Sequence, residues 1–337
     1  MKKKRNSNIE LLRLLCVVGI VSMHVFGLYK KDDLVMTGGT CTLFNNAICN
    51  FGTSVFMLIS GYYGLSFKKE KLFSLWNLTL FWSIVLIGVN DDFSAKYLAK
   101  SIFPILTGKY WFITAYIIIY CLSSYIEELI TRLSKRQFQQ MLAILLFFFY
   151  VAPTFLIFDI LHDSGKGVVN LFIIYLVGRY IALFGYPEKI YGFKWCWLFF
   201  IIIFFVFFIN LSLTFVSGVL FQKLSRDNSI FTLFEAVAVL CMVLQMEPHT
   251  SRRINNMAGY VFPIYVIHSA LIPRFIHIPE STHSFLYPMI WANALTISLI
   301  CVGLEFVRRL ILDKPFRLLV NKEIRLTEMI TQHLKRV

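Results

Sequence analysis

The chain has 337 residues, of which 58% are hydrophobic and 15% are charged, and its mean hydropathy is +0.68. Soluble globular proteins are close to half apolar and about a quarter charged, so this composition excludes a soluble enzyme and predicts a polytopic membrane protein. The net charge of +14 does not by itself indicate nucleic-acid binding, because its meaning depends on where the cations lie.

The first apolar stretch, residues 9–28, is long enough to span a bilayer and contains Glu10, Arg13 and His24. Ionisable side chains are costly in hydrocarbon, so their presence in a span is a hypothesis of function. Arg13 and His24 are separated by three helical turns plus about 20°, which places them on one face, about 16 Å apart along the axis. Glu10 is spaced to pair with Arg13. A signal anchor, with Arg13 and His24 reaching opposite headgroup regions, is the alternative interpretation.

Ten apolar runs approach the ~20 residues that a helix needs to cross a ~30 Å hydrocarbon core. No small-residue cleavage site follows the first run, so it is predicted to remain as an uncleaved span. The predicted spans are residues 9–28, 44–65, 72–89, 110–126, 141–158, 168–184, 195–216, 230–246, 259–276 and 286–307. The predicted fold class is therefore all-α, a polytopic membrane protein with about ten transmembrane helices.

The lysines and arginines are divided unevenly between alternate loops. With the N-terminus inside, 22 of the 33 fall in inner segments and 8 in outer segments, while Arg13, Arg179 and Arg274 fall within spans. Cytoplasmic loops carry the excess of Lys and Arg, so both termini are predicted to be cytoplasmic. The positive charge thus indicates the orientation of the chain in the membrane. Its predicted partner is the lipid headgroups, and no nucleic-acid partner is predicted.

The C-terminal segment, residues 308–337, alternates apolar and basic residues at helical spacing. This pattern predicts an interfacial amphipathic helix after Pro315. The predicted division is a transmembrane domain, residues 1–315, and a cytoplasmic amphipathic tail, residues 316–337. No internal repeat is visible, which counts against a transporter built from inverted halves.

Motifs of soluble enzymes are absent from the sequence. There is no GxSxG, P-loop, HExxH or Rossmann fingerprint. The seven cysteines lie mostly in apolar segments without CxxC or Cys/His ligand spacing, so free thiols and no metal site are predicted.

The end of the second span is a candidate binding region. It contains SGYYG at residues 60–64, and three lysines follow at once. Small residues allow close approach of a helix or ligand, and the lysines fit an anionic, nucleotide-bearing ligand. An aromatic belt followed by positive-inside charge would give the same pattern. The candidate residues for binding this anionic ligand are Arg13, Ser60, Gly61, Tyr62, Lys68, Lys69 and Lys71.

Other spans contain polar residues that either line a cavity or pack in the core. Tyr116 and Tyr120 recur at i, i+4 in the fourth span, and His268 follows Pro263, which is expected to interrupt the helix of the ninth span. Intramembrane charges face the bundle interior or a cavity as a rule. The candidate cavity-lining residues are Glu10, Trp111, Tyr116, Tyr120, Glu235 and His268.

Four of these features together resemble the acyltransferase-3 family of bacterial integral-membrane O-acyltransferases. They are the pattern Glu10, Arg13 and His24, the SGYYG segment, YWFITAY at 110–116, and INNMAGYVFPIYVIHSAL at 254–271. The resemblance covers residues 5 to about 315, and the Arg-x10-His spacing is its most specific part. It implies a multi-pass protein of a bacterial cell membrane, of the polysaccharide O-acetyltransferase type without a fused SGNH domain.

The resemblance implies transfer of an acyl group, acetyl in the first instance, from cytoplasmic acyl-CoA to a hydroxyl of an extracytoplasmic or lipid-linked glycan. Such glycans include capsule, exopolysaccharide, O-antigen and cell-wall sugars. The family's essential pair corresponds to Arg13 and His24, and its basic pair to Lys68 and Lys71. The family often has arginines there, which grip phosphate bidentately, whereas lysines act as point charges. Acetyl-CoA is the expected donor substrate, and no permanently bound cofactor is expected.

Within this hypothesis His24 acts as a general base toward the acceptor hydroxyl or carries the acyl group transiently. Tyr116, Tyr120 or His268 would stabilise the thioester oxyanion. The alternative hypothesis is a non-enzymatic transporter or lipid-linked glycan flippase whose intramembrane charges line a translocation path.

Overall fold

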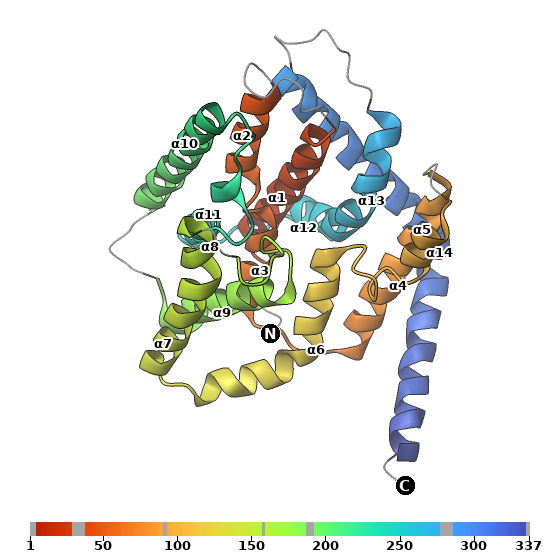
Figure 1. Cartoon of the computed structure of the whole chain (residues 1–337). Coiled ribbons are helices and arrows are strands. Elements are labelled where there is room, and N and C mark those ends of the chain that lie inside the picture. The colour runs from red at the N-terminus through yellow and green to blue at the C-terminus, as the bar shows by residue number, and fades with distance from the viewer. Residues whose placement is uncertain are drawn as a thin grey trace.

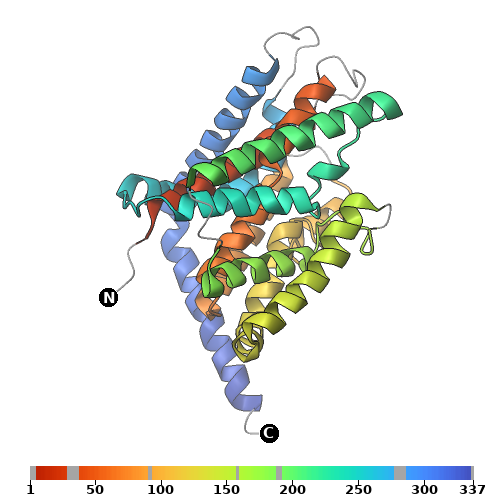
Figure 2. The same cartoon turned by 90° about the vertical axis from the view of Figure 1, so that its left-hand side faces the viewer.

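The computed structural model describes residues 5–28, 38–89, 93–156, 159–186, 192–276 and 286–334. Several cations counted in the topology argument lie outside these ranges, namely Lys2, Lys3, Lys4, Lys30, Lys31, Lys189, Lys335 and Arg336. Within the described ranges all regular structure is helical (Figures 1 and 2). The protein is therefore an all-α polytopic membrane protein.

The N-terminal half contains α1 (Ser7–Phe26), α2 (Gly38–Cys49), α3 (Gly52–Tyr63), α4 (Lys69–Val85), α5 (Ala95–Ile102), α6 (Trp111–Arg132), α7 (Lys135–Leu146) and α8 (Ala152–Phe155). A 3-10 turn (η1, Leu86–Val89) extends α4, and a π-helical turn (η2, Phe147–Val151) joins α7 to α8. The C-terminal half contains α9 (Val168–Phe184), α10 (Gly192–Ser217), α11 (Ile230–Leu244), α12 (Arg252–Met257), α13 (Val261–Phe275) and α14 (Leu286–Leu334), with 3-10 turns η3 (Lys223–Ser225) and η4 (Ala258–Tyr260).

Eight helical segments of the described chain are long and apolar enough to cross a membrane, and α9 is a shorter apolar helix. With α13 they correspond to the ten predicted spans. The second span begins earlier than predicted, because α2 and α3 form one apolar segment, Gly39–Tyr63. Pro263 lies in the first turn of α13, where its missing N–H has no intrahelical partner to lose. The prediction that Pro263 interrupts a helix is therefore wrong, because this proline lies at the start of α13.

Helix α14 joins the tenth predicted span to the segment after Pro315 for which an amphipathic helix was predicted. It continues through Pro315 as one helix of 49 residues, and its C-terminal half extends past the other helices in both views (Figures 1 and 2). Phe316 packs edge-on against Phe81 of α4, with ring centroids 5.4 Å apart, and Asn77 donates to Glu323 at 2.8 Å. Packing along α4 thus supports the helix beyond the proline.

Helix α1 lies at the junction of two hydrophobic clusters and packs against α2, α3, α13 and α14 (Figure 1). Its first half contributes Ile9 and Leu12 to a cluster built mainly from α3, α6, α9 and α11. Its second half contributes Val17 and Val21 to a cluster shared with α6, α13 and α14. The ionisable residues of α1 are therefore held by packing on both sides.

Asn255 and its neighbours anchor the start of α1. The Ser7 hydroxyl donates to the Asn255 side chain at 2.9 Å and accepts from the Ser251 N–H at 2.7 Å. The Asn6 side chain caps α1 by accepting from the Asn8 N–H. These contacts join the segment at 254–271 to the helix that carries Arg13 and His24.

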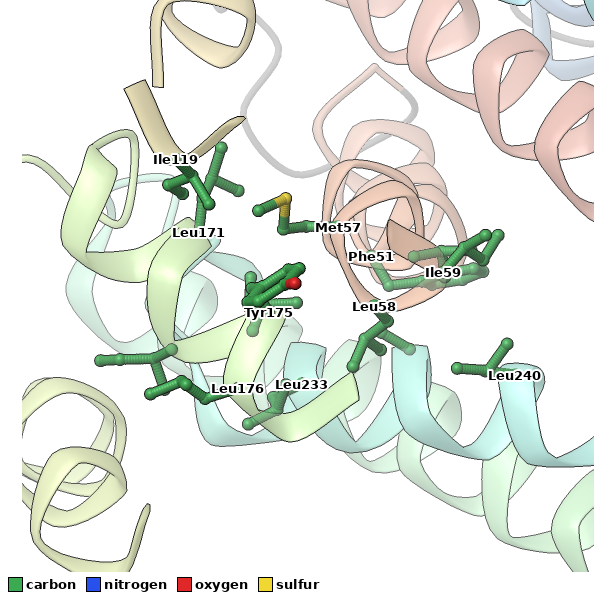
Figure 3. Packing of buried hydrophobic residues seen from close by; sticks show 14 of the residues in the cluster. Phe51, Met57, Leu58, Ile59, Ile119, Leu171, Tyr175, Leu176, Leu233 and Leu240 are labelled. Carbon is green, nitrogen blue, oxygen red and sulfur yellow. The ribbon is translucent and has the colours of Figure 1, made fainter. Parts of the chain in front are cut away.

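Helices α3 and α9 approach each other closely at Gly61 and Gly178, whose Cα atoms face one another. Figure 3 shows the apolar side of this contact, with Tyr175 of α9 beside Met57 and Leu58 of α3. A Cβ atom on Gly61 would lie far inside van der Waals contact with the Tyr175 carbonyl oxygen. Gly61 is therefore required where two backbones meet.

Gly61→Ala is expected to lower the free energy of unfolding by about 3 kcal/mol, because backbone atoms cannot move aside as a side chain end can. The measurement is the temperature at which half of the detergent-solubilised protein aggregates. Gly303→Ala is the matched control, since a Cβ at Gly303 meets no atom within 4 Å. Equal midpoints for the two variants would contradict the close helix contact.

Candidate active site

Arg13 is held on α1 by a buried carboxylate. Glu10 accepts from Arg13 Nη1 at 3.1 Å and from Arg5 Nε at 2.6 Å, and the Glu10 side chain is 7% exposed. The predicted pairing of Glu10 with Arg13 is confirmed. Because Glu10 is shared between two arginines, part of the Arg13 charge stays available, and its side chain is 30% exposed.

The Arg13 side chain lines a cavity of about 310 Å³, which we call the Arg13 cavity. Among the residues that the structure describes, its cations are Arg13 and Lys71, and no carboxylate lines it. Lys71 Nζ donates to the Tyr116 hydroxyl at 3.0 Å and lies 4.8 Å from the centre of the Tyr120 ring. The cavity therefore combines an apolar wall with two positive charges. Its lining is Arg13, Phe56, Ile59, Ser60, Tyr63, Gly64, Leu65, Lys71, Leu75, Phe112, Ile113, Tyr116, Val261, Phe262 and Tyr265.

The chain between α3 and α4 shapes the edge of this cavity. Gly64 has φ +74°, a backbone conformation that favours glycine, and packs on the Arg179 guanidinium. The Leu65 N–H donates to the Tyr175 hydroxyl at 3.0 Å, and the Lys68 N–H donates to the Tyr120 hydroxyl at 2.8 Å. The turn that ends at Lys68, directly before Lys69 and Lys71 of α4, is thus fixed by two buried tyrosines.

Arg179 lies behind this turn and pairs with Glu127 of α6 at 2.9 Å. Glu127 also accepts from the Tyr175 hydroxyl. The tyrosine that holds Leu65 is therefore tied to an ion pair between α6 and α9.

His24 is exposed to a second cavity, of about 450 Å³, called the His24 cavity here. Its charged residues are Lys166, Arg226 and Asp227, and three side-chain amides also face it. Asp227 is buried and accepts from the Thr53 hydroxyl at 3.0 Å. This cavity is more polar than the first. Its lining is Ile20, Met23, His24, Asn46, Asn50, Thr53, Trp111, Ser164, Lys166, Leu220, Gln222, Ser225, Arg226, Asp227 and Tyr265.

His268 of α13 lies beside His24, with ring centroids 4.9 Å apart. It is 2% exposed, and its Nδ1 is bonded to the Ile264 carbonyl oxygen at 2.9 Å. As a donor at Nδ1, its Nε2 is left to accept, and this atom has no hydrogen-bond partner among the described residues. The buried His268 ring therefore packs against the His24 ring, and its Nε2 can accept a further hydrogen bond.

The two cavities bring together only part of the predicted site. Arg13, Ser60, Lys71 and Tyr116 line the first, and His24 and Trp111 line the second. Eight predicted residues are absent from both linings, namely Glu10, Gly61, Tyr62, Lys68, Lys69, Tyr120, Glu235 and His268. Of these, Glu10, Tyr120 and His268 contact lining residues, while Glu235 is buried within α11 with one carboxylate oxygen unpartnered among the described residues.

Tyr265, Asp227 and Lys166 are lining residues that the sequence did not identify. Tyr265 precedes His268 by three residues, so it lies one helical turn away on a neighbouring face, and this spacing was a usable signal. Asp227 and Lys166 lie in segments that connect helices, and no periodicity indicates what such residues face.

Comparison with known proteins supports one family. The model of the acyltransferase-3 family, described as an acyltransferase domain, matches residues 6–304, nearly the whole chain. No curated protein and no solved structure matches the chain. The matched region contains α1, both cavities and α13, and the chain therefore belongs to the acyltransferase-3 family of membrane acyltransferases.

Proposed function

We propose that this protein transfers an acyl group, most simply acetyl, from acyl-CoA to a hydroxyl of a glycan on the opposite side of the membrane. The observation that carries the proposal is the pairing of two unlike cavities on one helix. Arg13 lies in a cationic, largely apolar cavity and His24 in a polar one. The acyl-CoA donor and the glycan acceptor differ in chemistry, and each would have a cavity that suits it.

The Arg13 cavity suits the donor. Its volume of about 310 Å³ is at the lower end for ligand pockets, which fits the narrow pantetheine arm of coenzyme A. Arg13 and Lys71 would bind its phosphates, since charge-assisted hydrogen bonds are the strong ones. Lys68 and Lys69 lie in the chain between the lining residues Leu65 and Lys71, and would meet the nucleotide end outside the cavity.

The orientation of the donor follows from charge distribution. The lysines after α3 belong to the set of segments that holds most of the Lys and Arg residues, and such segments face the cytoplasm. The Arg13 cavity would then open toward cytoplasmic acyl-CoA. The His24 cavity would open toward the other side, where surface glycans are found.

The His24 cavity suits a sugar. Asn46, Asn50 and Gln222 offer amides, and Asp227 offers a carboxylate. Sugar hydroxyls both donate and accept hydrogen bonds, so a mixed set of amides and a carboxylate can orient one of them toward His24.

The reaction would begin when neutral His24 accepts the proton of the acceptor hydroxyl as its oxygen attacks the thioester carbonyl carbon. The oxyanion that forms collapses, the carbon–sulfur bond breaks, and the coenzyme A thiolate takes the proton back from the imidazolium. The products are the O-acyl ester and free coenzyme A. His268 would fix the orientation of the His24 ring during both proton transfers.

The test compares base-labile acyl groups on surface polysaccharide in cells that express the wild type, Arg13→Ala or His24→Ala at matched membrane levels. We expect both variants to lose the ester while polymer yield stays constant. Leu15→Ala is the matched α1 control, because Leu15 is 62% exposed and lines neither cavity. Loss of ester only together with the polymer would instead support a flippase.

A further inference from the structure

Tyr265 is the one residue, among those that the structure describes, that the linings of the Arg13 cavity and the His24 cavity share. Its position is matched on α6, where Trp111 lines the His24 cavity and the next residue, Phe112, lines the Arg13 cavity. The start of α6 and the second turn of α13 therefore form the partition between the two spaces.

The partition is held in place by packing. The Tyr265 ring centroid lies 5.6 Å from that of Phe112 and 5.9 Å from that of His268. Its neighbours on α13, Ile264, Val266 and Ile267, are at most 2% exposed. The contacts with Phe112 and His268 restrict the half-buried Tyr265 ring on this well-packed helix, because packed side chains move little.

We propose that Tyr265 determines the size of the acyl group that the enzyme transfers. This inference rests on the proposed function, in which the thioester carbonyl reaches His24 from the Arg13 cavity. The acyl chain must then lie beside the Tyr265 ring, the shared wall of the two cavities. An acetyl group occupies little of that space, whereas each further methylene must fit against the aromatic ring.

Removal of the ring opens apolar space where a longer chain can pack. One methylene in an apolar pocket changes selectivity by roughly 10–200-fold. We therefore expect Tyr265→Ala to raise the ratio of butyryl to acetyl transfer at least about tenfold. Tyr265→Phe keeps the ring and should keep the wild-type ratio whatever its absolute rate, because size and not the hydroxyl is decisive.

The experiment uses membranes of the native host that contain the endogenous glycan acceptor and the full-length protein. Equal concentrations of radiolabelled acetyl-CoA, propionyl-CoA and butyryl-CoA compete, and the base-labile acyl esters in the polymer are separated and counted. Tyr265→Leu is measured beside Tyr265→Ala, so that a poorly accumulating alanine variant still leaves a graded change in size. Tyr125→Ala on α6 is the control, since Tyr125 is 72% exposed and lines neither cavity.

The expected result is an acetyl-selective wild type, a shift toward butyryl in the order leucine then alanine, and no shift for Tyr265→Phe or Tyr125→Ala. An unchanged ratio in both small variants, or a wild type that uses butyryl as readily as acetyl, overturns the role of Tyr265 and leaves the proposed function standing. A wild type that transfers none of the three acyl groups overturns the proposed function and this inference with it.

Discussion

His24→Gln is expected to lower kcat for acyl transfer by about 10²–10⁴-fold, the range that a general base contributes, while KM for acyl-CoA stays near its wild-type value. Glutamine is similar in size to histidine and keeps hydrogen-bonding atoms, but it cannot accept a proton at neutral pH. The donor would bind in the Arg13 cavity, which His24 does not line. The loss should therefore appear in catalysis and not in donor binding.

Arg13→Gln should give the opposite kinetic pattern. Loss of a charge-assisted hydrogen bond costs about 1.5–3 kcal/mol, so KM for acyl-CoA should rise roughly 10- to 100-fold with a smaller change in kcat. The measurement is the rate of label transfer from acetyl-CoA to polymer in native membranes, over a range of donor concentrations. For the His24→Gln variant, by contrast, a normal kcat with a raised KM would show that His24 takes no part in the chemical step.

The same membranes can distinguish the two roles that remain open for His24. A covalent acyl-histidine intermediate would let the wild type exchange label between acyl-CoA and free CoA without any acceptor. A general base requires the acceptor to be present before the thioester is broken. We expect no exchange in acceptor-depleted membranes, because His24 is exposed to the cavity assigned to the acceptor.

Periodicity predicted most of the fold, because each apolar helix is a local feature of the chain. Helix α9, for example, has the predicted bounds, 168–184. The continuity of α14 through Pro315 depends on packing against Phe81 and Asn77 of α4. These partners are more than 200 residues away in sequence, so no local pattern reveals them.

The predicted residues that line the cavities come from several helices, since Ser60, Lys71, Trp111 and Tyr116 join Arg13 and His24, but the sequence predicted contacts only along α1. Helical spacing places Arg13 and His24 on one face, and the ion pair with Glu10 followed from the i, i+3 rule. The spacing does not reveal that the two residues line separate cavities, because α3, α6 and α13 supply the walls. The spacing of Tyr265 from His268 could have indicated a cavity-lining residue, but its position between two cavities depends on the packing of α13 beside α6.

Glu305→Leu is expected to lower the free energy of unfolding by about 3–5 kcal/mol, the cost of removing one partner from a buried ion pair. Glu305 of α14 is 0% exposed and accepts from Arg308, Arg309 and Trp82 of α4. The donor to acceptor distances to Arg308 are 2.7 and 2.8 Å. One carboxylate thus pairs with two arginines at a helix contact.

The buried cation of Arg308 is the reason why we expect a large loss of stability in Glu305→Leu. Its side chain is 8% exposed, and its Nη1 already has no hydrogen-bond partner among the described residues. Without Glu305 its charge would be buried against Phe316, whose ring centre lies 4.7 Å from the guanidinium carbon. A leucine in place of Glu305 fills the space but leaves this cation uncompensated.

The Glu305 cluster also connects α14 to η4. Arg309 donates to the Gly259 carbonyl oxygen at 2.7 Å and lies over the Tyr260 ring. The loss of Glu305 should loosen α14 from both α4 and η4. The measurement is the unfolding midpoint of the detergent-solubilised protein. Glu128→Ala is the matched control, since the Glu128–Arg132 pair is 60% and 74% exposed and such surface pairs contribute at most about 1 kcal/mol.

Glu305→Gln separates charge from hydrogen bonding at this position. The amide keeps the shape of the carboxylate and one acceptor oxygen, so it can retain part of the contacts to Trp82 and Arg308, but it cannot neutralise a cation. We expect its midpoint to lie between those of the wild type and Glu305→Leu. A midpoint for Glu305→Leu equal to that of Glu128→Ala would show that the buried cluster contributes no more than a surface ion pair.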